Sequence, residues 1–280
     1  MGLYIETHIR TDLDDLWTRT QDPAHRRRWD LRLTRIEYLP HPDPDTAPRP
    51  FRCTARVLPF LTVHGTGMAA AERERPDGTR TSALRFTSPH PLSPLIGAGG
   101  YWRYVPDAHG VRFLTGCDHR LRGGRPGALA DRLLLRPLTV WATAWSFDRL
   151  RLWLERGITP ERALANWLAE LAVRALVLAA CLTGLGLEPM LPLLGPLAPV
   201  LAFLCPLLLV LVISAALFKA PLAGTPAARR CLRSPVVQPR VPGVLRTLEQ
   251  QGSRLSPPRP PVPSPAACAR TAPDGRAGPR

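Results

Sequence analysis

Lysine is almost absent from the sequence: 37 residues are Lys or Arg, and all of them except Lys219 are arginine. The formal net charge is +15, and a strongly basic chain is attracted to nucleic acids and anionic membranes through their phosphate groups. No RRM, helix-turn-helix or other nucleic-acid module accompanies the arginines. Arginine also recurs with Ala, Pro and Gly in the variable parts, as in a GC-rich coding sequence. We therefore expect no nucleic-acid partner.

Paired cysteines are missing as well. The six cysteines form no C-x-x-C pair and no spacing typical of metal ligands; they are Cys53, Cys117, Cys181, Cys205, Cys231 and Cys268. Scattered cysteines indicate reduced thiols in a cytoplasmic compartment, without disulfides or a zinc site. The N-terminal stretch carries charges from Glu6 onward and has no apolar run, so we expect no signal peptide.

The motifs of common enzyme classes are absent too. No H-E-x-x-H motif, no defensible Ser/His/Asp order and no paired carboxylates at helical spacing occur. The glycine cluster GAGGYW at 97–102 fails the G-x-G-x-x-G pattern at its last position. The sequence therefore predicts neither a bound metal nor a cofactor.

A long apolar run is present between Ala175 and Phe218, where Glu188 is the only charged residue. A bilayer core of about 30 Å needs roughly 20 apolar residues per helix, so this run is long enough for two crossings. We expect a transmembrane hairpin over 167–218, with a second segment that either spans fully or is re-entrant because it contains four prolines. A buried soluble hairpin is the alternative.

The flanks of this run predict its orientation. The connection around Glu188 has no Lys or Arg, whereas the segments before and after the two spans are rich in arginine. We expect a multi-pass protein of the cell membrane with both termini in the cytoplasm. A linker is expected over 158–166. Residues 219–280 are dominated by Pro, Ala, Arg, Ser and Gly and are predicted to be disordered.

Residues 1–157 alternate with a period of two, interrupted by helices in two places. LYIETHIRT is typical of a half-buried strand, and DLDDLWTRTQD of a helix capped by Asp12. PAHRRRWD predicts a second short helix, and about six further strands precede one long helix that ends near Gly157. The expected order is one strand, two helices, six antiparallel strands and a long helix, which is an α+β fold.

This order, the DLDDLWTRTQDPAHRRRWD segment and the terminal helix resemble the START-like superfamily, which is also called SRPBCC and includes polyketide cyclase/dehydrase and lipid-transport proteins. The D-P-x-x-x-x-x-W pattern is matched by Asp22, Pro23 and Trp29. The resemblance covers 1–157 and implies a helix-grip domain, in which a curved antiparallel sheet surrounds a long C-terminal helix. It also implies a largely apolar cavity between them.

Counting by two along the strands predicts the side chains that face such a cavity, and the long helix contributes a stripe at i, i+4, i+7 and i+11 from Leu134. The cavity residues we expect are Phe86, Phe113, Thr115, Cys117, His119, Leu138, Trp141 and Trp145. His119 is the polar exception and is either a general base or a hydrogen-bonded structural histidine. Trp153 is expected to be an anchor at the membrane interface.

The run Arg26, Arg27 and Arg28 lies on the second predicted helix beside Trp29. It is either a solvated helical face or a contact for a phosphate or headgroup, and the solvated face is the simpler interpretation.

We therefore expect a membrane-tethered cytoplasmic domain that binds a hydrophobic small molecule or lipid by apolar burial. A cyclase- or dehydratase-like enzyme that uses His119 is one alternative. A non-catalytic protein that recruits a partner to the membrane is the other. The sequence identifies neither the ligand nor a protein partner.

Overall fold

The computed structural model describes most of the chain. The described residues are 3–40, 48–58, 61–72, 75–88, 95–186 and 198–235, together with 242, 243, 245 and 248.

The order of elements is the one expected from the sequence. The first part comprises β1 (Leu3–Ile9), α1 (Leu13–Gln21), α2 (Pro23–Trp29), β2 (Leu33–Tyr38), β3 (Arg49–Leu58), β4 (Leu61–Glu72), β5 (Arg80–Thr87), β6 (Leu95–Asp107) and β7 (Gly110–Leu121). The second part comprises α3 (Gly124–Ala130), the π-helical turn η1 (Asp131–Leu135), α4 (Arg136–Arg156), α5 (Pro160–Gly186), α6 (Ala198–Phe218) and the short 3-10 turn η3 (Ala228–Arg230).

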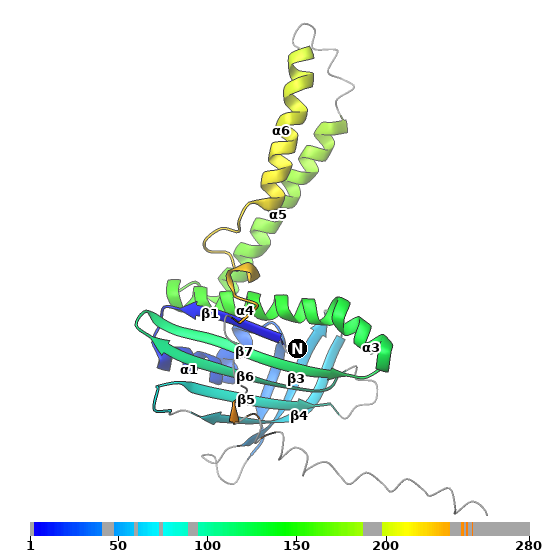
Figure 1. The fold of residues 1–280 in the computed structure, drawn as a ribbon. Helices are drawn as coiled ribbons and strands as arrows, with labels where there is room; N and C mark the ends of the chain where they lie inside the picture. Colours follow the sequence, from blue (N-terminus) through cyan, green and yellow to red (C-terminus); the bar gives the residue numbers. More distant parts are fainter. Residues whose placement is uncertain are drawn as a thin grey trace, which may run out of the picture.

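The seven strands form one antiparallel sheet in the order β1-β7-β6-β5-β4-β3-β2. The helix α4 lies across one face of this sheet, and the pair α5–α6 projects away from it (Figure 1). Gly110 closes the β6–β7 hairpin with φ 141°, where a Cβ atom would lie 2.3 Å from the carbonyl oxygen of Ile9. The architecture is the helix-grip α+β fold that the sequence pattern indicates.

Local capping explains why α1 and α2 begin where they do. The Asp12 carboxylate accepts from the Asp14 amide at 2.8 Å. The Asp22 carboxylate accepts from the Ala24 amide at 2.8 Å, and Pro23 occupies the first position of α2, where no amide hydrogen is needed. These two short helices bring Trp29 into the interior, where it is fully buried.

An aromatic layer holds α4 against the sheet. Phe113 of β7 stacks on Phe147 of α4 with ring centroids 4.4 Å apart. Trp29 packs beside them, 5.8 Å from Trp102 and 6.3 Å from Phe147. Stacked and edge-to-face pairs of this kind each contribute about 1 kcal/mol beyond the area that they bury. The filled core therefore lies under the second half of α4.

The expected apolar stripe of the long helix is not buried over its first half. Leu134 is 50% exposed, and Leu138 and Trp141 are each 39% exposed. The buried face runs instead through Thr143, Trp145, Ser146, Phe147, Leu150 and Leu152. The π-helical turn at Asp131–Leu135 places Leu134 outside the regular spacing of α4, and within α4 Trp141 and Trp145 lie on the side that contacts Trp167 of α5 (Pro160–Gly186).

Trp153 was expected at the membrane interface, but it is 9% exposed and belongs to the core. The guanidinium groups of Arg19 and Arg28 lie over its ring at 4.2 and 4.7 Å. Gly157, with φ 65°, then ends α4 in the left-handed conformation that favours glycine. The expected linker 158–166 is reduced to a short turn, because α5 begins at Pro160.

The apolar run forms the two helices α5 and α6, which contact one another side by side (Figure 1). Pro160–Thr183 is long and apolar enough to cross a membrane, with a mean hydropathy of 1.6, and almost none of it is buried within the protein. The apolar stretch of α6, Leu204–Phe218, is shorter. Glu170 and Arg174 form an i,i+4 pair within α5, with Arg174 Nε 3.1 Å from Glu170 Oε1. Residues 187–197 of the expected hairpin lie outside the described residues.

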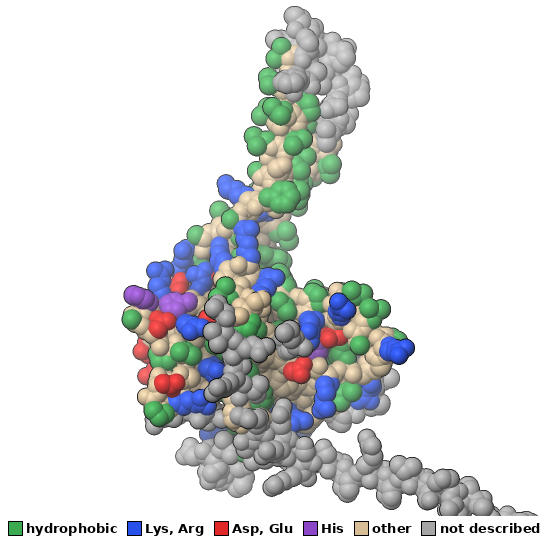
Figure 2. Space-filling model, viewed as in Figure 1, with side chains coloured by type: hydrophobic (Ala, Val, Ile, Leu, Met, Phe, Trp, Pro, Cys, Tyr) green, Lys and Arg blue, Asp and Glu red, His purple; other side chains and the backbone are tan. Residues whose placement is uncertain are grey.

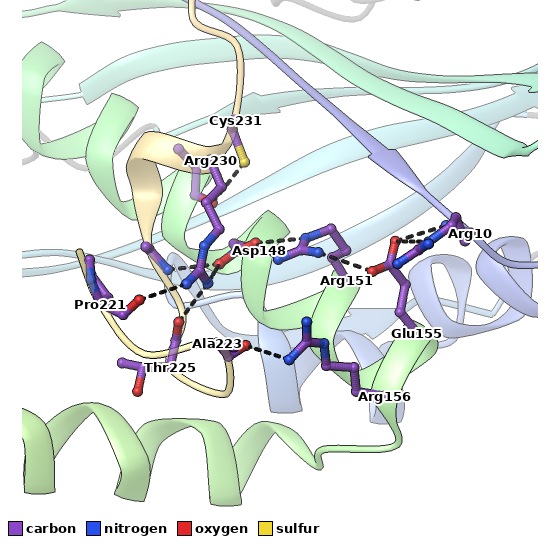
Figure 3. Close-up of polar contacts among 12 residues, drawn as sticks. Arg10, Asp148, Arg151, Glu155, Arg156, Pro221, Ala223, Thr225, Arg230 and Cys231 are labelled. Atoms are coloured by element: carbon purple, nitrogen blue, oxygen red, sulfur yellow. Dashed lines mark hydrogen bonds and ion pairs between the residues drawn. The ribbon is translucent and has the colours of Figure 1, made fainter.

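The first part of the tail is ordered, which corrects the expectation that disorder begins at Lys219. Residues 219–235 return from α6 to the domain and form an isolated antiparallel bridge between Leu232 and Glu6 of β1. The fully buried carboxylate of Asp148 accepts from the Ala227 amide at 2.8 Å and from Arg230 Nη1 at 2.9 Å (Figure 3). Composition could not reveal this segment, because its stability comes from a partner about 80 residues away in the sequence.

Two residues further along the tail are also ordered. Leu245 and Leu248 are buried on the outer face of the sheet with Ala83, Tyr101 and Leu114. The outer face therefore has an apolar patch that the chain covers itself. The remainder of the expected tail lies outside the described residues.

The docking of residues 219–235 predicts that Arg230 stabilises this segment and that its neighbour Arg229 does not. Arg230→Gln removes the donors to Asp148 and to the carbonyl oxygens of Pro221, Leu222 and Thr225. We expect the opening free energy of this segment to fall by about 2 kcal/mol and its amide exchange to rise roughly thirtyfold. Hydrogen exchange of the full-length protein, read at the amides of Ala227 and Leu232, measures this. The matched control is Arg229→Gln, which changes an exposed side chain; equal exchange in both variants contradicts the prediction.

Candidate functional site

A cavity of about 230 Å³ lies between the sheet and the first half of α4. Strands β2 to β7 supply one wall, and α2, η1 and α4 supply the others. Most of the lining is apolar, including Ile36, Phe51, Leu84, Phe86, Leu95, Leu121, Leu135 and Leu138. Such a volume and lining suit a small apolar ligand or the apolar part of a larger one.

Five of the eight expected cavity residues line this space. They are Phe86, Thr115, Cys117, His119 and Leu138. The pleat places alternate residues of β7 on one face, and the end of β7 that α4 does not fill carries Thr115, Cys117 and His119. These three side chains lie on the face of β7 that counting by two indicates.

The other three expected residues lie elsewhere, for a reason that the sequence does not contain. Phe113 and Trp145 are part of the filled core under α4. Trp141 lies between Trp145 and Trp167 of α5, with ring centroids 6.3 and 6.4 Å away. Trp141 and Trp145 therefore both contact Trp167 of the hairpin, and the cavity is bounded instead by the smaller Thr139 and Ala142.

His119 has an acidic partner that sequence reasoning missed. Its Nε2 atom lies 2.6 Å from Oδ1 of Asp131, which belongs to η1. Arg136 is at a longer distance from the same carboxylate, 3.9 Å from Nε to Oδ2. A carboxylate on one ring nitrogen fixes the tautomer of a histidine and its orientation. The twelve-residue separation across a turn left no periodic signal for this pair.

A second charged group at the cavity was also missed. Asp30 is fully buried, and its two oxygens accept from Nε and Nη2 of Arg32 at 3.0 Å each. Arg26 Nε lies 3.8 Å from Asp30 Oδ2. Both arginines line the cavity, whereas Arg27 and Arg28 are exposed. The expected solvated face of α2 is therefore correct for two of its three arginines and wrong for Arg26.

Burial and ion pairing have opposite effects on the pKa of Asp30. Burial alone would raise the pKa of Asp30, but the guanidinium groups of Arg32 and Arg26 outweigh it and hold that pKa below its ordinary value. Burial lowers the pKa of the Arg26 guanidinium. The i,i+4 spacing of Arg26 and Asp30 is visible in the sequence, but such pairs usually lie in solvent and are no sign of a buried site.

The thiols at the cavity are poor nucleophiles. Burial raises the pKa of Cys53 to about 11, and it also raises the pKa of Cys117. The thiolate is the reactive form of cysteine, so little of it is present at neutral pH. Among the described residues, no group of three His, Cys, Asp or Glu side chains is placed to hold a metal ion.

Comparison with known proteins gives one curated relative. No family model matches the chain. Over 165 residues it is 41% identical to the uncharacterized membrane protein YndG of Bacillus subtilis (strain 168). The match covers 59% of this chain and 61% of that protein, so the chain spans less than two thirds of the relative's length.

Solved structures give more distant likenesses. A STAR-related lipid transfer protein from Xanthomonas axonopodis is 22% identical with a TM-score of 0.37, over 47% of this chain and 75% of that one. A START superfamily protein from Mycobacterium smegmatis is 12% identical with a TM-score of 0.37, over 52% of this chain and 94% of that one. The di-domain ARO/CYC protein StfQ of the steffimycin biosynthetic pathway is 15% identical with a TM-score of 0.40, over 58% of this chain and 51% of that one.

The buried group at the cavity predicts a pH-dependent stability. Asp30→Asn removes the carboxylate beside the buried Arg26 and the partly buried Arg32, and we expect the free energy of unfolding to fall by about 3 kcal/mol at neutral pH. Because the folded-state pKa of Asp30 lies below its ordinary value of 3.8, its contribution is present above that pH and is lost as the pH falls further. The difference between wild type and variant should therefore narrow in acid.

Denaturation of the full-length protein in micelles, followed by tryptophan fluorescence at pH 7 and at about pH 3, checks this expectation. Asp14→Asn is the control, because its carboxylate is 77% exposed and pairs with Arg80 at the surface. A pH-independent difference for Asp30→Asn would show that the carboxylate does not stabilise the fold through its charge.

Proposed function

We propose that this protein is a membrane-tethered domain that binds a hydrophobic small molecule or lipid in the cavity between the sheet and α4. The observation that carries the proposal is the cavity itself, about 230 Å³ of space with mainly apolar walls between the sheet and α4. Each Å² of apolar ligand surface removed from water there contributes about 25 cal/mol. Thr115, Thr139 and His119 add polar groups that orient a ligand.

The tether is supported by composition and by the relative. The curated relative is named a membrane protein, and α5 has the length and hydropathy of a membrane span. Its apolar side chains face outward, including Leu168, Leu171, Val173, Leu176 and Leu182. Hydrophobic side chains cover the projecting pair of helices, and basic side chains gather where the pair joins the domain (Figure 2). A bilayer around the hairpin accounts both for the apolar side chains on its surface and for the basic side chains where it joins the domain.

The proposed orientation keeps the domain and the docked tail segment on one side of the membrane. The chain leaves the domain after α4 and returns to it at residues 219–235, so the two ends of the hairpin are on the same side. Arginines flank both helices, which favours the cytoplasmic side for the domain and both termini. The cavity is then held near the bilayer, where lipophilic molecules concentrate.

Ligand binding is tested by filling the cavity. Ala98→Phe places a ring where β6 lines the space, and we expect ligand occupancy to fall at least tenfold while the fold is retained. Native mass spectrometry of the full-length protein released from detergent measures the mass of any bound lipophilic molecule. Ala108→Phe, at the exposed β6–β7 turn, is the matched control.

Two outcomes argue against binding. Equal occupancy in wild type and Ala98→Phe means that the molecule binds elsewhere. A wild-type protein that binds no lipophilic mass, even when such molecules are supplied, favours a recruitment role in place of ligand binding.

The pair His119–Asp131 favours one second candidate, a cyclase- or dehydratase-like activity. A histidine at a cavity wall with a carboxylate 2.6 Å from one ring nitrogen has the arrangement of a general base held in place. The other ring nitrogen is the one that would take a proton from a bound polyketone. The two thiols at the cavity are no comparable base, since burial raises the pKa of both and keeps them protonated.

This second candidate predicts a specific loss of activity. With a linear polyketone as substrate, wild type should yield a product lighter by one water, and His119→Ala should form it about a hundredfold more slowly. Liquid chromatography with mass detection follows the product, and Asp118→Asn, a neighbouring exposed carboxylate, is the control. Equal rates in wild type and His119→Ala, or no conversion by wild type, would exclude this role.

A further inference from the structure

The most unusual polar group in the cavity is the guanidinium of Arg26. The side chain is 9% exposed, stacks 4.0 Å above the ring of Trp102 and lines the cavity. Its Nε atom is buried and has no hydrogen-bond partner among the described residues. The nearest carboxylate, Asp30, is 3.8 Å away and already accepts from Arg32 through both of its oxygens.

The charges around Arg26 do not balance. Arg32 and Asp30 neutralise each other in a bidentate pair, which leaves one positive charge on Arg26. The described residues that line the cavity include two arginines and His119, but neither Asp nor Glu. His119 is occupied by Asp131. A buried charge without a partner is strongly unfavourable, so an arginine is retained in such a place where something else supplies the anion.

We propose that the ligand has a single carboxylate that binds Arg26, and that its apolar part lies along the walls formed by Leu84, Phe86 and Leu138. This inference rests on the proposed function, and it specifies the class of ligand as an apolar monocarboxylic acid. Arginine donates two parallel hydrogen bonds to a carboxylate, a geometry that an ammonium group cannot reproduce.

The charge balance also selects against other headgroups. A monoanion cancels the one positive charge of Arg26, whereas a phosphate monoester carries close to two negative charges and leaves an excess of the opposite sign. An alcohol or ester leaves the guanidinium charge uncompensated. A chain with a terminal carboxylate therefore fits the group formed by Arg26, Asp30 and Arg32 better than these alternatives.

The test compares two ligands that differ only in their polar end. Radiolabelled decanoate and decan-1-ol are titrated onto the full-length protein in lipid nanodiscs, and binding to empty nanodiscs is subtracted. We expect wild type to bind decanoate at least tenfold more tightly than decan-1-ol. We expect Arg26→Met to remove this preference by weakening decanoate alone.

Two further variants separate the role of Arg26 from general effects of charge. Arg27→Met, on the exposed side of the same helix, should keep the full preference for decanoate. Arg26→Lys retains the charge without the planar fork and should bind decanoate with intermediate strength. The melting temperature of unliganded Arg26→Met should be no lower than that of wild type, because the substitution removes a buried charge whose nearest carboxylate already pairs with Arg32.

The outcomes distinguish this inference from the proposed function. If wild type binds both ligands equally, or if Arg26→Met keeps the preference, the carboxylate site is wrong while the apolar cavity stands. If wild type binds neither ligand, both proposals fail. If Arg26→Met does not fold, Arg26→Lys takes its place in the comparison. A smaller preference for decanoate over decan-1-ol in Arg26→Lys than in wild type then supports the inference, and an unreduced preference overturns it. Free acetate that displaces decanoate only weakly shows that the apolar chain is also required.

Discussion

The stacking of Phe113 on Phe147 is the contact on which the interior of this domain depends. It holds the second half of α4 tightly against the sheet, and the rings of Trp29 and Trp102 complete the layer. The first half of α4 presents Leu138 and the smaller Thr139 and Ala142 to the cavity, and leaves space between the helix and the sheet. The same helix therefore closes the core at one end and covers a cavity at the other.

The helix α4 also links the cavity to the projecting helices. Its Asp148 is fully buried between Arg151, Arg230 and the Ala227 amide, so the returning segment is attached directly to the helix that covers the cavity (Figure 3). Trp141 and Trp145 on the same helix pack against Trp167 of α5. These contacts join α4 directly to the hairpin and to the segment that returns from it.

Much of the fold was predictable because its signals are local. The capping carboxylates of Asp12 and Asp22 mark the starts of α1 and α2, and the pleat of β7 places Thr115, Cys117 and His119 on one face. The long helix was less predictable, since leucine and tryptophan occur on several of its sides. Leu134 and Trp141 were expected in the interior but are half-exposed, because the π-helical turn and α5 determine which side faces the sheet.

The sequence by itself determined the order of strands and helices, the apolar run of α5 and α6, and the inward residues of β7, because each depends on a period of a few residues. Only the tertiary structure decided which polar groups meet: His119 with Asp131, Asp148 with Arg230, and Arg26 beside a carboxylate already bound to Arg32. Burial and charge balance depend on contacts between distant segments. For that reason the three consecutive arginines of α2 are indistinguishable in the sequence, and only one of them is buried at the cavity.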